Sequence, residues 1–234
     1  MRAVVLSGGL THDFPATTAC LAALLEGEGA EVEVHTGTAG VDSALSALPG
    51  AGLFVVNALR WSMTGPQTPE RYRGAAAAEE GVSPSPAARE ALAAHLAAGG
   101  GVLGMHTASI CFDDWTDWGD TLGGAWVWGS SSHPPLGPDV EVAVTASHPL
   151  VDGLDDFRIL DEVYSDLQMR PGIEPLLAAR RPGDDAGPAQ PLLWAREHGG
   201  GRVVYDALGH HVPSYEVPEH REMVRRAIAW TTRG

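Results

Sequence analysis

The sequence has few cysteines, few basic side chains and no long apolar run. Its two cysteines, Cys20 and Cys111, are too few for a disulfide framework, and their apolar surroundings favour buried free thiols. Fifteen basic residues against thirty acidic ones give a formal net charge of −15, which repels phosphate backbones and anionic lipids. No apolar stretch approaches the length of a membrane span. We therefore predict a cytoplasmic protein without nucleic-acid or membrane partners.

The 234 residues are enough for one full hydrophobic core, and we find no internal repeat, so a single domain over residues 1–234 is expected. Apolar runs predict strands at 2–6, 31–35, 52–56 and 102–105, and helical spacing predicts helices at 15–29, 41–48, 86–98 and 219–232. This alternation is typical of an α/β fold, with a mainly parallel sheet and helices on both faces. From Val140 onward, short strands separated by turns predict antiparallel strands at the edge of the sheet.

Two further segments have an open interpretation. Residues 62–85 are rich in Pro, Gly, Ala and charged side chains without periodicity, which indicates an irregular excursion and a candidate cover for a site. The apolar face of the last helix is expected to pack either into this chain's own core or against a second copy in a homo-oligomer.

The stretch GGGVLGMHTASICF, residues 99–112, organises the chain. Val102, Leu103 and Met105 suit a buried strand that stops at His106, and the hydroxyls of Thr107 and Ser109 suit the start of a helix. A turn from strand to helix holds its residue at the carboxyl edge of a sheet. An imidazole there can move protons, donate a hydrogen bond or bind a metal.

Four polar or aromatic side chains follow four different predicted strands: His12, Trp61, His106 and His210. Ligands of open parallel sheets bind outside the carboxyl ends of the strands, so we expect these side chains to converge there. His211 neighbours His210, and only one of the two is expected to face the site.

Later loops supply three more candidates. A segment with four tryptophans precedes His133, and the run DEVY contains Glu162 and Tyr164, which share one face if the run is a strand. Each candidate also has an ordinary structural interpretation. His106 could be a hydrogen-bonded core residue, and Trp61 could pack in the core. His133 could belong to a surface turn, Glu162 to a solvated strand edge, and His12 could cap the first helix.

Several histidines and a carboxylate at one cleft would match a divalent metal such as zinc in ligand type. The candidate ligands are His106, His133, Glu162 and His210. Neither HExxH nor His-x-His spacing occurs, so the local signal for a metal is weak.

The order of motifs, from the strand with its His elbow through the Trp-rich loop, SSHP, SHPL, DEVY and a late strand ending in GH, resembles the ThuA-like (trehalose utilisation) family over nearly the whole chain. The resemblance implies a flavodoxin-like, doubly wound fold similar to class I glutamine amidotransferases. Those enzymes have Cys at the elbow, whereas this chain has His106, so glutamine hydrolysis is not expected. The resemblance also implies a link to trehalose-related sugars and their keto forms.

The leading hypothesis is an enzyme that acts on a small sugar or keto-sugar by isomerisation, elimination or hydrolysis. His106 and Glu162 would transfer protons, and His210 would orient the substrate or stabilise an oxyanion. His12, Trp61, His133 and Tyr164 would bind the sugar. One alternative is a non-catalytic carbohydrate-binding or interaction protein on the same scaffold, and another is a hydrolase that uses Cys111.

Overall fold

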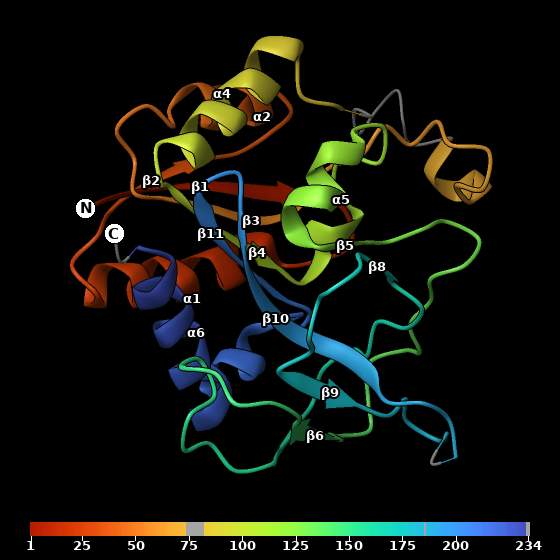
Figure 1. Ribbon diagram of the computed structural model, residues 1–234. Coiled ribbons are helices and arrows are strands. Elements are labelled where there is room, and N and C mark those ends of the chain that lie inside the picture. Colours follow the sequence, from red (N-terminus) through yellow and green to blue (C-terminus); the bar gives the residue numbers. More distant parts are fainter. Residues whose placement is uncertain (74–81, 185, 233–234) are drawn as a thin grey trace.

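The computed structural model describes residues 1–73, 82–184 and 186–232. Within these residues a nine-stranded sheet runs through the molecule in the order β2-β1-β3-β4-β11-β10-β9-β6-β7 (Figure 1). Its first five strands are parallel, and the remaining four are added antiparallel. The start of the order, with β2 and β3 on opposite sides of β1, is that of a flavodoxin-like doubly wound fold.

The parallel half forms from the apolar runs of the sequence. Its strands are β1 (Arg2–Gly9), β2 (Glu31–His35), β3 (Leu53–Leu59), β4 (Gly101–Met105) and β11 (Gly201–Asp206). Every residue of β3 and β4 is buried, as expected for strands covered on both faces. β2 lies at the edge, and its polar residues alternate with Val32 and Val34.

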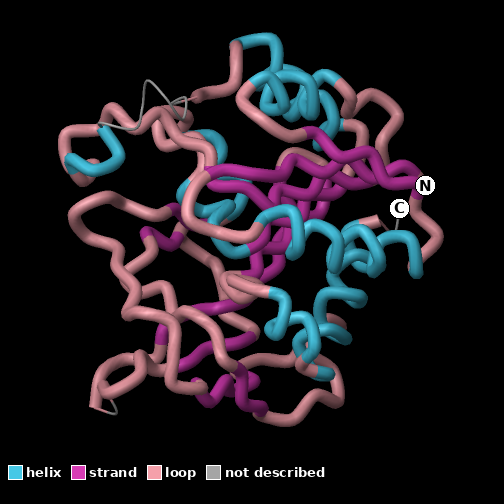
Figure 2. Tube along the Cα trace, turned by 180° about the vertical axis from the view of Figure 1, so that it is seen from behind, coloured by secondary structure: helices cyan, strands magenta, loops and turns pink. Residues whose placement is uncertain are grey.

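Helices cover both faces of this half (Figures 1 and 2). α1 (Phe14–Gly27) and α6 (Pro218–Thr231) pack together on one face, and α2 (Ala39–Ser46) and α4 (Pro86–Ala97) pack together on the other. Asp13 caps α1 by accepting from the Ala16 amide at 3.1 Å, and Ser85 caps α4. The apolar face of α6, including Met223 and Ile228, is fully buried in the core of this chain.

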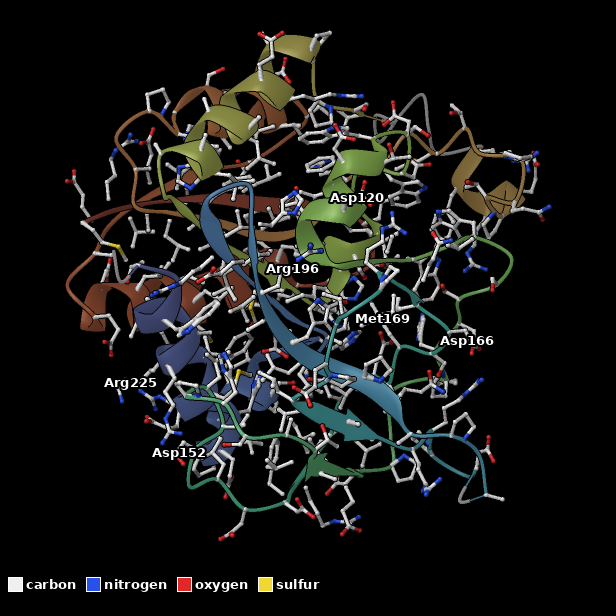
Figure 3. All side chains as sticks on the ribbon, viewed as in Figure 1. Asp120, Asp152, Asp166, Met169, Arg196 and Arg225 are labelled. Atoms are coloured by element: carbon white, nitrogen blue, oxygen red, sulfur yellow. The ribbon has the colours of Figure 1, made fainter. Side chains whose placement is uncertain are left out.

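The antiparallel half widens the sheet beyond β11. It consists of β10 (Gln190–His198), β9 (Leu177–Ala179), β6 (Val140–Val144) and β7 (Phe157–Ile159), while β5 (Gly124–Ala125) and β8 (Gln168–Met169) form a separate pair. α5 (Thr116–Leu122) is tied to β10 where Arg196 Nη1 donates to the Asp120 carbonyl at 2.8 Å (Figure 3). The expected α/β architecture with antiparallel edge strands is confirmed.

Only a short helical turn begins after β4, and the expected hydroxyl caps from Thr107 and Ser109 are wrong. Residues His106–Ile110 form a short 3₁₀ turn, η1, and a second 3₁₀ turn, η2, spans Val212–Glu216. The hydroxyl of Thr107 donates to the Ala58 carbonyl at 2.6 Å instead of capping a helix, and Ser109 Oγ bonds the Tyr205 hydroxyl at 2.8 Å. These bonds pin the turn to the neighbouring strands.

The irregular excursion is described only in part, because residues 74–81 lie outside the described residues. Ahead of them, Ser62 is fixed by Asp113, whose carboxylate accepts from its amide at 2.6 Å and from its hydroxyl at 2.9 Å. Tyr72 packs against Trp61 and Trp128. No helix within the described ranges has both the length and the apolarity needed to cross a bilayer.

Candidate histidine–carboxylate site

His106 directly follows β4 and has an uncommon backbone conformation that tertiary contacts stabilise. Its φ of +44° is uncommon for a residue with a side chain. The Tyr205 hydroxyl donates to its carbonyl at 2.7 Å, and its Nδ1–H donates to the Ala207 carbonyl at 2.7 Å. Because a carbonyl can only accept, the Nδ1 proton is fixed, and Nε2 points to the other side.

Three side chains from distant parts of the chain meet His106 Nε2. It lies 3.1 Å from the Tyr164 hydroxyl, 3.3 Å from His210 Nδ1 and 3.4 Å from Glu162 Oε2. His106 is 2% exposed and Glu162 is 5% exposed. Of the four side chains expected to converge, His106 and His210 meet here, together with Glu162 and Tyr164 from the later DEVY run.

His12 joins this cluster from the loop after β1. Its ring centroid lies 5.1 Å from that of His106 and 4.7 Å from that of His210. Its Nδ1–H donates to the Leu10 carbonyl at 3.2 Å, and its Nε2 is buried without a hydrogen-bond partner among the described residues.

Glu162 links the cluster to a more exposed histidine. Its Oε2 is 3.4 Å from both His106 Nε2 and His210 Nδ1, yet it makes no well-angled hydrogen bond within the described part of the chain. Its Oε1 is 3.2 Å from Nδ1 of His133, whose side chain is 39% exposed. Residues 161–164 form no regular strand, although Glu162 and Tyr164 both reach His106 as alternate residues of an extended segment would.

The charges in the cluster depend on one another. Burial alone would raise the pKa of Glu162, but its contacts with His106, His133 and His210 hold that pKa far below its usual range. Burial opposes a charge on His106, yet Glu162 and the negative charge of Asp161 raise its pKa. The contact with Glu162 also raises the pKa of His133. Burial and the nearby His106 lower the pKa of His12 to about 4.

The donor atoms fit a divalent metal ion. His12, His106, His210 and Glu162 each offer one ligand atom, and these atoms all lie within 4.8 Å of one another. His12 and His106 both use Nδ1–H on a backbone carbonyl and present Nε2, the arrangement that orients metal-bound histidines. The buried, unpartnered His12 Nε2 and Glu162 Oε2 are two of the four atoms that a cation would satisfy.

The remaining sequence candidates lie around this set. His133 reaches only the outer oxygen of Glu162, so the geometry places His12 rather than His133 among the four ligand atoms. Trp61 is fully buried against Tyr72 and Trp128, with ring centroids 5.3 and 5.7 Å away. His211 is not among the four ligand residues, and its Nδ1 lies 3.0 Å from Ser214 Oγ.

Sequence reasoning missed Asp161, whose carboxylate accepts hydrogen bonds from backbone amides next to the cluster. It is 1% exposed, and its Oδ2 accepts from the Gly209 amide at 2.7 Å and from Ser214 Oγ at 2.6 Å. Its Oδ1 accepts from the Glu162 amide at 2.8 Å. Asp161 therefore joins the segment of Glu162 to the segment of His210. The DEVY run signals two adjacent acids, but it does not indicate that the first is buried.

Cys111 does not suit nucleophilic chemistry. Its Sγ donates to the Ala58 carbonyl at 3.1 Å and accepts from the Arg60 amide at 3.3 Å. Burial raises the pKa of its thiol to about 12, so almost no thiolate forms at neutral pH.

Fold and site together define a flavodoxin-like α/β protein with a histidine–carboxylate cluster outside the carboxyl ends of β1, β4 and β11. The model of the ThuA family, described as trehalose utilisation, matches residues 2–231, and the chain belongs to this family. No curated protein matches the sequence.

Solved structures share the fold at low sequence identity. A ThuA-like protein from Parabacteroides merdae has a TM-score of 0.74 at 16% identity, over 99% of this chain and 90% of that one. A cytoplasmic protein from Salmonella typhimurium has a TM-score of 0.67 at 15% identity, over all of both chains. A cold-adapted β-galactosidase from Rahnella has a TM-score of 0.59 at 16% identity, over 98% of this chain and 30% of that one.

Proposed function

We propose that this protein is a cytoplasmic enzyme of trehalose-related metabolism that acts on a sugar or keto-sugar at a single divalent metal ion, such as zinc. The observation that carries the proposal is the set of four ligand atoms from His12, His106, His210 and Glu162, two of which are buried without a partner among the described residues. Membership of a trehalose utilisation family supports the substrate class.

The ion would be held by His12, His106, His210 and Glu162. Because Nδ1 of His12 and of His106 is bonded to a backbone carbonyl, these two would use Nε2, whereas His210 would use Nδ1, which faces His106 and Glu162. When bound, such an ion supplies Lewis-acid polarisation of a sugar oxygen. His106 and Glu162 then act as ligands, which differs from the proton-transfer roles that we expected for them from the sequence. Both are almost completely buried, whereas the side chain of His133 is 39% exposed.

His133 would move the proton, since it contacts Glu162 and its side chain is 39% exposed. Its contact with Glu162 raises its pKa and so favours the protonated imidazole, which can donate a proton. The Tyr164 hydroxyl lies 3.1 Å from His106 Nε2, and burial raises the pKa of this phenol, so it stays protonated. With the ion on Nε2, this hydroxyl would donate its hydrogen bond to the sugar instead. The expected outcome is isomerisation, elimination or hydrolysis next to the polarised oxygen.

A second candidate is metal-free acid–base chemistry by His106 and Glu162. Their separation of 3.4 Å and the opposite shifts of their pKa values favour an ion pair when no cation is bound. The two candidates differ in metal content, which is measured directly.

The test is elemental analysis of protein purified without added metal and then equilibrated with zinc. We expect about one equivalent in the wild type and in His211→Ala, and a loss of most of it in His210→Ala. The two variants remove adjacent imidazoles, of which only His210 faces the cluster. Well under one equivalent in the wild type after zinc addition would contradict the metal centre.

Catalysis is tested by incubating trehalose and keto-disaccharides with the wild type, His106→Ala and His133→Ala, with products followed by NMR. We expect turnover by the wild type and its loss in both variants. Full turnover by His106→Ala would refute the site. Sugar binding without turnover in the wild type would support the non-catalytic alternative instead.

A further inference from the structure

Beside the cluster, a cavity of about 530 Å³ opens at the carboxyl end of β1. It is lined by Ser7, Gly8 and Gly9 of β1, by His12, and by Arg60 after β3. The sheet order reverses here, because the chain passes from β1 outward to β2 and then back to β3 on the other side of β1. This crevice is the general ligand position of a doubly wound sheet.

Arg60 lines this cavity as a cation without a partner among the described residues. Within the described residues its guanidinium makes no hydrogen bond or ion pair, and its Nε is buried and unsatisfied. A Cβ built on Gly8 would lie 3.2 Å from Arg60 Nη2, so the guanidinium lies directly against this backbone. A buried guanidinium nitrogen without an acceptor is costly, and a ligand that supplies oxygens removes that cost.

The charge around the cavity favours an anion. None of its described lining residues is a carboxylate, although the chain has thirty acidic residues. Arginines elsewhere do pair with acids, as Arg2 does with Glu33 at 2.7 Å and Arg170 with Asp120 at 2.5 Å. The planar guanidinium offers paired N–H donors that match a carboxylate or a phosphate.

His12 connects this cavity to the cluster. It lines the cavity, and its Nε2 is one of the four candidate ligand atoms. A ligand in the cavity can therefore contact Arg60 at one end while its reacting end lies beside the cluster. We propose that Arg60 binds an anionic group, a carboxylate or a phosphate, on the sugar that the enzyme acts on. This inference rests on the proposed function, because it specifies the substrate class of that same site.

The test measures binding, by calorimetry, of glucuronate and glucose 6-phosphate, with glucose and trehalose as neutral probes. The proteins are the wild type, Arg60→Met, Arg60→Lys and the control Arg158→Met, all checked for folding by thermal unfolding. Arg158 is an exposed arginine of β7, an edge strand of the antiparallel half.

We expect the wild type and Arg158→Met to prefer the anionic probes, and Arg60→Met to bind them about tenfold or more weakly with little change for neutral sugars. Arg60→Lys keeps the charge and is expected to recover part of the loss. The stronger of the two anionic probes identifies the carboxylate or the phosphate as the anion.

Three results would overturn the inference: equal affinity of Arg60→Met and the wild type for the anionic probes, neutral sugars bound as tightly as anionic ones, or no binding of either anionic probe. Metal content separates this failure from failure of the proposed function. If the wild type and Arg60→Met both hold the ion but bind anions equally, only the role of Arg60 fails. If binding depends on Arg60 but no ion is held, the metal centre fails alone.

Discussion

Asp161→Asn is expected to loosen the cluster without touching any candidate ligand. The two side chains have nearly the same shape, but asparagine replaces one carboxylate oxygen with an NH2 group. If that group takes the place of Oδ2, it faces the Gly209 amide and the Ser214 hydroxyl, which are both donors to the native oxygen. Asp161 is 1% exposed, so water cannot compensate.

Hydrogen bonds to a charged group contribute about 1.5–3 kcal/mol each, and two are lost. The Ser214 hydroxyl can rotate and accept from the new amide, so we expect a net loss of about 2–4 kcal/mol in the free energy of unfolding. Domains of this kind have stabilities of about 5–15 kcal/mol, so the variant still folds.

The assay is urea unfolding of metal-free protein followed by tryptophan fluorescence, with Asp152→Asn, an exposed carboxylate, as the control. A second readout separates positioning from general destabilisation. In folded protein, zinc affinity is expected to fall about 10- to 100-fold, because partners behind the ligands orient them. Unfolding free energies of Asp161→Asn and the wild type that agree within about 0.5 kcal/mol would refute this account of the network.

Three further predictions concern buried groups elsewhere. Burial opposes a charge on His220, but Asp206 Oδ2 at 2.8 Å raises its pKa. The pairing therefore stabilises the fold fully at pH values below the pKa of an unfolded histidine, and this stabilisation is lost as the pH rises through the pKa of the folded state. His220→Gln should therefore destabilise more at about pH 6 than at about pH 9 in urea unfolding, and an equal effect at both would contradict the pairing. Iodoacetamide should leave Cys111 unlabelled until the protein is denatured, as peptide mass spectrometry would show, and labelling in native protein would contradict its burial. Gly101→Ala places a methyl group against the Thr231 carbonyl oxygen and should cost about 1–3 kcal/mol in thermal unfolding, whereas an unchanged Tm would contradict the close packing of β4 on the end of α6.

The parallel half of the sheet could be predicted because its signal is local. β3 and β4 are apolar at almost every position, and the breaks between elements are marked by Gly and Pro. The last helix was expected at 219–232 and spans Pro218–Thr231. The carboxyl ends of parallel neighbours share one edge, which is why His12, His106 and His210 could be expected together.

The finer parts of the site depend on contacts between distant residues. Thr107 and Ser109 have ordinary helix-cap side chains, but their partners Ala58 and Tyr205 are 49 and 96 positions away. His210, and not its neighbour His211, contacts His106, with Nδ1 3.3 Å from His106 Nε2. This choice depends on the tertiary fold and is not visible in the sequence.

The same limit applies to pairs of acids and pairs of histidines. Asp161 and Glu162 are adjacent carboxylates, and only the fold assigns one to the backbone and the other to the cluster. His12 and His133 both lie outside regular helices and strands. The sequence does not show that His12 is the one that lies beside His106. Arg60 illustrates this as well, since its lack of a partner among the described residues is visible only in the folded chain.

The place of β11 has a consequence for biosynthesis. Along the chain this strand follows all the other strands of the described sheet, yet it lies between β4 and β10 and joins the parallel and antiparallel halves. Until it emerges, one side of β4 has no partner strand, and His106 lacks both the carbonyl of Ala207 and the imidazole of His210. A nascent chain that stops before residue 201 therefore holds two unjoined half-sheets, and the cluster is completed only after residues 201–210 have been synthesised.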